Sequence, residues 1–236
     1  MTTGSLPDSS PESTDMAGQL AAAHLALDAA RAREAALRTE LEHRVRNTLA
    51  ITRSVFLRTM DNAETVEHAR DHFVGRLDTL ARYNARLAIG SQPRLDLETM
   101  IWDELLSMAL GSDERIEVTG PEVLLQQRVA GLIGLALHEL ATNSVKFGVV
   151  GHPSAGGRLR VRWENKGQSV QLEWAESGVP IVASAPIGSG FGRDFIENAL
   201  PYQLNADTRF EFVPGGLICR IAFEVSDRTT GEPFLS

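Results

Sequence analysis

The stretch Val129–Phe147, with the sequence VAGLIGLALHELATNSVKF, decides the fold because it joins a buried helix to a polar cluster. Its apolar first half predicts a helix inside the molecule. At about 3.6 residues per turn, Glu139, Asn143 and Lys146 fall on one side of that helix. A carboxylate, a carboxamide and an ammonium facing one cleft are typical of a site for Mg²⁺ and a nucleoside triphosphate. A buried helix whose last turns emerge into solvent would show the same change of composition. Other segments of the chain must therefore decide between a nucleotide site and a solvent-exposed helix end.

Length and composition favour a reduced intracellular protein. The chain has 236 residues, enough for one large domain or two small ones, and a formal net charge of −8. Basic residues are spread along the chain, so we expect no nucleic-acid partner. The single cysteine, Cys219, lies in an alternating apolar stretch and cannot form an internal disulfide. No apolar run of about eighteen residues is present, so we expect no membrane span and a cytoplasmic location.

The N-terminal part predicts a disordered start followed by one long helix. Residues 1–15 are rich in Ser, Thr, Pro and Asp and hold too little apolar surface to order themselves. Residues 16–60 are rich in Ala, Leu, Arg and Glu without an internal breaker, which is typical of a continuous helix. An apolar seam in steps of seven or fourteen, interrupted by Glu34, includes Leu20, Leu27 and Leu41.

A second helix is expected from Val66 to the breaker at 90–93. Its apolar seam is Val66, Ala69, Phe73, Leu77, Leu80 and Leu87. His68 and His72 lie one turn apart, but no third metal ligand accompanies them, so we assign both to a solvated face. The two antiparallel helices, residues 16–92, are too thin to bury both faces. We therefore expect a homodimer that forms a four-helix bundle.

After Pro93 the pattern is that of a two-layer α+β domain over residues 93–228, with a short tail at 229–236. Helices are predicted at about 97–110, 127–147 and 193–200. Strands are predicted at about 115–119, 123–125, 158–165, 169–176, 208–213 and 217–225. The last four strands form two hairpins, and a glycine-rich loop at 178–192 lies between them.

A second polar constellation, HRVRN at 43–47, lies in the first long helix. Counted at about 100° per residue, His43 lies roughly 160° from the centre of the neighbouring apolar stripe and should be exposed. An exposed histidine on a rigid helix can accept a phosphoryl group, and Glu42 could orient its ring. A lone surface histidine is more often only solvated, so this motif does not decide the function by itself.

Taken together, the motifs resemble those of the His-Trp-Glu family of histidine kinases in bacterial two-component signalling. HRVRN at 43–47 is followed by HELATNSVKFG at 138–148 and WAESG at 174–178, in the order of the family. GSGFG at 188–192 is similar to the family's second glycine box. The resemblance covers about residues 40–225. It implies a dimerising antiparallel helical hairpin followed by a Bergerat-type ATP-binding α/β sandwich.

The resemblance also implies roles for particular residues. His43 would be the phosphoacceptor, and Glu139 the catalytic carboxylate that polarises the acceptor or orders the metal. Asn143 would bind Mg²⁺, Lys146 would contact phosphates and Glu176 would meet the adenine amino group. The other expected nucleotide-binding and signature positions are His138, Trp174, Gly178, Gly188, Gly190 and Gly192.

The implied function is that of an ATP-dependent protein histidine kinase that passes the phosphoryl group from His43 to an aspartate of a response regulator. Two alternatives remain, an ATP-independent phosphotransfer module and a pseudokinase scaffold of the same fold. The phosphotransfer module is supported by the short lid over 178–192 and by Val179, which stands where the family commonly has glycine and stiffens the loop. About 40 residues precede His43, too few for a sensing domain, so we expect an upstream regulator to dock on the N-terminal helix.

Overall fold

The computed structural model describes residues 11–89, 94–108, 113–151, 156–179 and 190–225. The chain forms two compact units, Met1–Ile51 and Thr52–Ser236. Helix α1 (Pro11–Asp61) begins in the first unit and ends in the second. In the part of the chain that is described, no helix is both long and apolar enough to cross a lipid bilayer.

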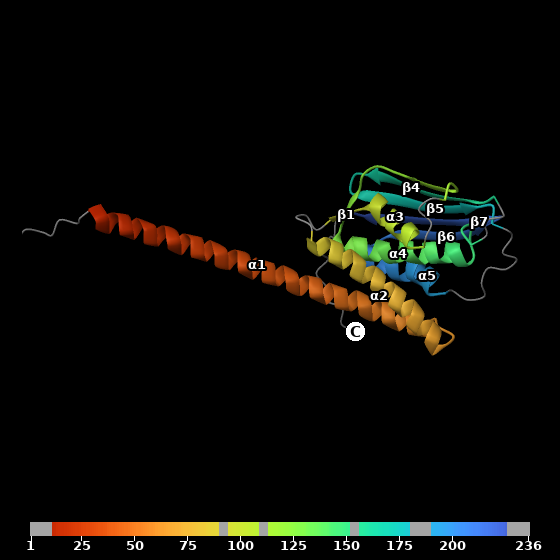
Figure 1. The fold of residues 1–236 in the computed structure, drawn as a ribbon, viewed down its shortest axis with the longest axis horizontal. Helices are drawn as coiled ribbons and strands as arrows, with labels where there is room; N and C mark the ends of the chain where they lie inside the picture. Colours follow the sequence, from red (N-terminus) through yellow and green to blue (C-terminus); the bar gives the residue numbers. More distant parts are fainter. Residues whose placement is uncertain (1–10, 90–93, 109–112, 152–155, 180–189, 226–236) are drawn as a thin grey trace, which may run out of the picture. The chain divides into compact units, whose positions relative to one another are not determined.

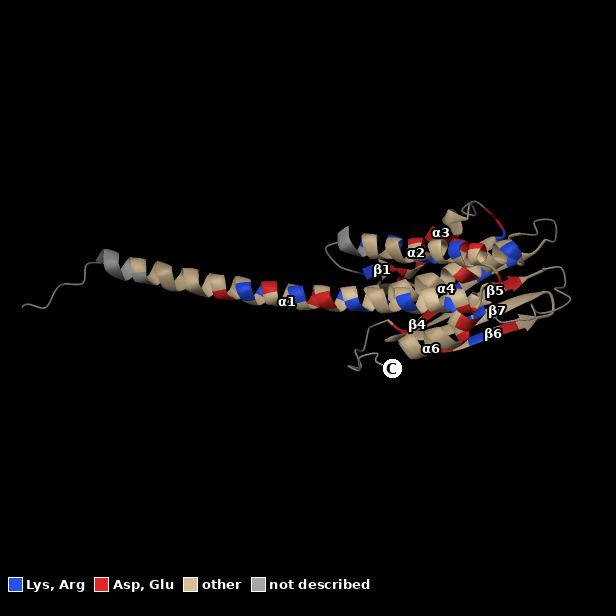
Figure 2. Cartoon of the chain, turned by 90° about the horizontal axis from the view of Figure 1, so that it is seen from below, with Lys and Arg blue, Asp and Glu red and all other residues tan. Residues whose placement is uncertain are grey.

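Helix α1 confirms the long helix predicted for residues 16–60 and extends it at the N-terminus. Acidic and basic bands alternate along its middle (Figure 2), where Arg38 and Arg44 pair with Glu42 and Glu40 across one helical turn. Such pairs support a helix by a few tenths of a kcal/mol each, at most about 0.5. The seam leucines predicted from the steps of seven are exposed, with Leu41 at 61%.

The α+β fold predicted for the C-terminal part is confirmed. A five-stranded sheet has the order β2-β4-β5-β7-β6, in which β2 pairs parallel with β4 and all other neighbours are antiparallel. Its strands are β2 (Ile116–Thr119), β4 (Arg158–Lys166), β5 (Ser169–Ser177), β6 (Asp207–Val213) and β7 (Gly216–Glu224). A short pair, β1 (Arg94–Asp96) with β3 (Leu124–Gln126), adds a strand that the sequence did not indicate.

Helices cover one face of this sheet, as the alternation of its strands requires. Along β5, the even-numbered side chains Val170 to Glu176 are buried while Gln171 and Ser177 are exposed. The covering helices are α3 (Leu97–Ser107), α4 (Gln127–Lys146), α5 (Phe191–Asp194), the π-helical segment η2 (Phe195–Ala199) and α6 (Leu200–Leu204). Helix α2 (Val66–Ile89) packs against α4 (Figure 1), so α4 is buried along most of its length.

Small residues on α4 allow this close approach of α2. A Cβ atom on Gly134 would lie 2.1 Å from the ring of Tyr83, a fully buried side chain of α2. The buried stripe of α2 also includes Leu80, whereas Leu77 is 39% exposed and Val66 is 79% exposed. Part of the predicted seam, Ala69 and Leu80, is thus buried within the chain, and the pairing of Val66 and Leu77 with a second copy stays a prediction.

We expect Gly134→Ala to destabilise the protein by about 1–3 kcal/mol, since the added methyl group overpacks the contact with Tyr83. The matched control is Gly131→Ala on the same helix, where the new Cβ would meet only Leu80, at 3.7 Å. That change should be neutral or stabilise by up to about 1 kcal/mol through helix propensity. Urea denaturation of both variants measures the difference, and equal losses would contradict the packing described.

Candidate functional site

The structure brings together three of the predicted site residues at the junction of α4 and α5. Glu139 is buried and Asn143 half-buried, one turn apart on α4. A Cβ atom on Gly192 would lie 2.9 Å from Glu139 Oε2 and 3.4 Å from Asn143 Nδ2, so only glycine fits there without displacement. Gly190 is exposed immediately before α5, and Gly188 lies outside the described residues.

Lys146 lies further along α4 and meets helix α2 at the surface. Its Nζ is 3.4 Å from Nε2 of His72. Burial, and then the charges of Lys146 and Arg76, lower the pKa of His72, so the neutral ring can accept a hydrogen bond from the ammonium group. His72 is half-buried rather than solvated, because α2 turns this face toward α4.

A buried ion pair joins Glu139 to helix α2. Arg76 Nε donates to Glu139 Oε1 at 2.7 Å, and Arg76 Nη2 donates to Oε2 at 3.1 Å. The two side chains are only 4% and 8% exposed. Arg76 Nη1 donates to Thr59 Oγ1 at 2.9 Å, and the guanidinium carbon lies 3.4 Å from the ring centroid of Phe191. Arg76 thus contacts the end of α1, α4 and α5 at once.

Trp174 and Glu176 lie where β5 meets the C-terminal end of α4. The Glu176 carboxylate is buried, with Oε1 accepting from Trp174 Nε1 at 3.1 Å and Oε2 from the Val149 amide at 2.9 Å. Gly148 makes room for it, since a Cβ atom there would lie 1.9 Å from Oε2. Each oxygen keeps a further lone pair that could accept from an adenine amino group. Gly178 follows at φ +76°, a turn conformation that favours glycine.

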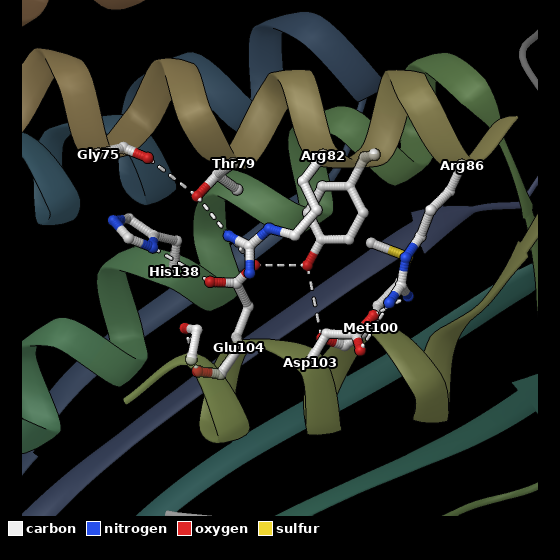
Figure 3. Close-up of polar contacts among 10 residues, drawn as sticks. Gly75, Thr79, Arg82, Arg86, Met100, Asp103, Glu104 and His138 are labelled. Carbon is white, nitrogen blue, oxygen red and sulfur yellow. Dashed lines mark hydrogen bonds and ion pairs between the residues drawn. The ribbon is translucent and has the colours of Figure 1, made fainter. Parts of the chain in front are cut away.

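His138 belongs to a different cluster, at the meeting point of α2, α3 and α4 (Figure 3). Its Nδ1 lies 3.1 Å from Oε2 of Glu104, a carboxylate that is 1% exposed. Glu104 Oε1 also accepts from Tyr83 at 2.6 Å and pairs with Arg82 at 3.1 Å. Burial, and then the Glu104 charge, raise the pKa of Tyr83, which keeps its hydroxyl a donor. Nε2 of His138 faces Gly75, so this ring is turned to α2.

His43 is exposed on α1, as its angular position predicts. Exposure does not single it out, because Val45 and Leu49 of the predicted apolar stripe are also at least half exposed. The Glu42 carboxylate accepts from Arg38 and Arg46 at 3.3 and 3.4 Å. The expectation that Glu42 orients the His43 ring is therefore not confirmed by its contacts.

The residues around Glu139 fit a magnesium nucleotide in their chemistry. No group of three His, Cys, Asp or Glu side chains gathers as a metal site among the described residues. A protein amide oxygen with substrate phosphates and water is, however, an ordinary ligand set for Mg²⁺. The buried Ser144 hydroxyl, beside Asn143, also has no hydrogen-bond partner within the described chain. A hollow of about 250 Å³ lies at the end of β5, and its lining includes Glu176 and Gly178 together with Arg158 and Arg160.

Two residues of these networks, Arg76 and Glu104, were missed from the sequence. Each is a charged residue on the buried stripe of its helix, and that pattern could have identified both. Arg76 follows Phe73 by three positions and precedes Leu80 by four. Glu104 follows the buried residues Met100 and Ile101 by four and three positions. Buried charges are rare without a partner, so their positions indicate ion pairs even when the partner is unknown.

We expect Glu176→Gln to destabilise the protein by about 1–3 kcal/mol, because glutamine offers one acceptor oxygen where two buried donors require two. The control is Glu173→Gln on the other face of the same strand, where the exposed pair with Arg220 contributes at most about 1 kcal/mol. Denaturant titrations measure both variants. A loss no larger for Glu176 than for Glu173 would contradict the hydrogen bonding described.

Comparisons with known proteins agree with the motifs. The family described as HWE histidine kinase matches residues 40–122. A blue-light-activated histidine kinase of Brucella ovis is 30% identical over 193 residues, covering 80% of this chain and 39% of that protein. The protein of the same name from Brucella canis matches equally. The chain thus spans about two fifths of the length of the curated relatives it matches.

Solved structures share the fold. The blue-light activated histidine kinase EL346 of Erythrobacter litoralis is similar with a TM-score of 0.53 and 20% identity, covering 81% of this chain and 63% of that one. Its histidine kinase domain gives a TM-score of 0.52 at 18% identity, covering 67% of this chain and 76% of that one. With these matches and the motifs HRVRN, HELATN and WAE in their order, the chain belongs to the HWE family of histidine kinases.

Proposed function

We propose that this chain is an ATP-dependent protein histidine kinase that phosphorylates His43 and passes the phosphoryl group to a response-regulator aspartate. The observation that carries the proposal is the cluster of Glu139, Asn143 and Gly192. A carboxylate and a carboxamide lie one turn apart on α4 against a glycine, where a Cβ atom would come within 2.9 Å of the carboxylate. Membership of the family supports the same conclusion.

In this proposal the nucleotide lies along the C-terminal half of α4. The Asn143 amide oxygen would hold Mg²⁺, which neutralises phosphate charge during transfer. Glu139 would order the metal or accept the proton of the attacking imidazole. Lys146, an exposed ammonium seven residues from Glu139, would contact the phosphates. Glu176, held by Trp174 and Val149, would accept from the adenine amino group.

His43 would be the nucleophile, since an exposed histidine on a rigid helix can accept a phosphoryl group at a ring nitrogen. We also propose that α1 pairs with a second copy of the chain. Its support is the row of apolar side chains that the long helix leaves exposed, which includes Leu20, Leu27, Leu37, Leu41, Val45 and Leu49. We further propose that an upstream regulator can bind helix α1.

We expect Asn143→Ala to lower incorporation of radiolabel from γ-labelled ATP at least about a hundredfold, because it removes the metal ligand. The control variant is Asn165→Ala, which changes an exposed residue of β4 and should label normally. Thermal melts of both variants establish that they are folded. Full labelling of the Asn143 variant would contradict the assignment.

We expect His43→Ala to lose all acid-labile label while it binds ATP as the unchanged protein does. His24→Ala is the matched control, since His24 is another exposed histidine of α1. Label retained in the His43 variant would overturn the acceptor assignment. If the unchanged protein bound ATP without labelling, a phosphotransfer module or a pseudokinase would replace the kinase proposal.

A further inference from the structure

Helix α2 lies over the face of α4 that the proposed nucleotide requires. Glu139 and Lys146 stand two helical turns apart on that face. Each meets a residue of α2, Glu139 through the ion pair with Arg76 and Lys146 through the contact with His72. Arg76 and His72 are themselves one turn apart on α2. Two of the three polar groups assigned to the nucleotide are thus occupied by one helix of the hairpin.

The contact at Glu139 leaves that carboxylate little freedom to act on anything else. Both of its oxygens accept from the same guanidinium, which is the strongest arrangement for an arginine and a carboxylate. Oε2 also lies against the backbone of Gly192. The Glu139 side chain is 8% exposed, so water does not compete with Arg76 for it.

The same contact also holds helix α5, which begins inside the glycine box. Phe191, the first residue of α5, stacks on the Arg76 guanidinium, and Asp194 at the end of α5 pairs with Arg58 of α1. Thr59, one residue beyond Arg58, accepts from Arg76. The end of α1, helix α2 and α5 are therefore connected around one guanidinium group.

We propose that α2 is an autoinhibitory element and that Arg76 is the positioning residue that withholds Glu139 from ATP·Mg²⁺. The inference rests on the proposed function and adds its regulation. Movement of α2 away from α4 releases Glu139 and Lys146 together. A ligand that binds only the released state has its apparent affinity reduced by the fraction of molecules in that state. By linkage, bound ATP·Mg²⁺ weakens the contact between α2 and α4 to the same extent.

The test measures ATP·Mg²⁺ binding to the full chain by calorimetry, in parallel with labelling of His43. Arg76→Gln removes the ion pair and should tighten ATP·Mg²⁺ binding roughly tenfold if about one molecule in ten is released in the unchanged protein. Arg76→Lys keeps one charge without the paired hydrogen bonds, and should tighten binding by a smaller factor. Lysine also serves as the second variant if the glutamine variant does not fold, which thermal melts establish.

The matched control is Arg70→Gln, on the same helix, where the exposed arginine pairs with the adjacent Asp71 and not with Glu139. It should bind ATP·Mg²⁺ as the unchanged protein does. Unchanged or weaker ATP·Mg²⁺ binding by a folded Arg76 variant would overturn autoinhibition. Weaker binding would indicate instead that Arg76 contacts the phosphates. Absence of ATP binding and labelling in every variant would overturn the proposed function itself, and autoinhibition with it.

Discussion

The buried ion pair between Arg76 and Glu139 is the interaction on which the arrangement of helices around α4 depends. A guanidinium and a carboxylate buried together are tolerated because each satisfies the other, and removal of one partner typically costs about 3–5 kcal/mol. The pair fixes α2 on α4, and the stacked ring of Phe191 extends the contact to α5. The glycines of α4 contribute by leaving room for the side chains of Tyr83 and Leu80 from α2.

A second buried carboxylate, Glu104, makes the same helix junction specific. It ties α3 to Tyr83 of α2 and to His138 of α4, so the first two residues of the HELATN motif are each connected to the hairpin. Two residues of the family motif therefore also take part in the packing of the helices. Of these two residues, Glu139 pairs directly with Arg76 of α2, and His138 is linked to α2 through Glu104 of α3.

Most of the fold could be predicted from the sequence because its periodicities are strong. The alternation over 158–176 indicated the central hairpin, and the apolar run before His138 indicated α4. The three-residue strand β1 could not be predicted, because so short a segment has no periodicity. The packing of α2 on α4 was not predicted, since steps of seven describe pairing between helices of a bundle and do not reveal contacts with a following domain. The domain boundary predicted at residue 92 stays a prediction, although the compact unit begins at Thr52.

The candidate site was predictable as a set of residue types but not as a set of contacts. Spacing placed Glu139, Asn143 and Lys146 on one side of a helix, yet spacing cannot reveal that Arg76, 63 positions earlier, covers that side. Long-range pairing depends on the tertiary fold. Here the pairing with Arg76 covers Glu139, which the sequence alone predicted to face an open cleft. His138 shows the same limit, because its partner Glu104 comes from another helix.

The most direct measurement of this account is a double-mutant cycle of unfolding free energies with Arg76→Met, Glu139→Gln and the double variant. If the two side chains form the buried pair, each single change destabilises strongly and the double change costs less than the sum. We expect a coupling of about 2 kcal/mol or more from urea denaturation. Additivity within about 0.5 kcal/mol would mean that the two residues do not interact, and would contradict the account.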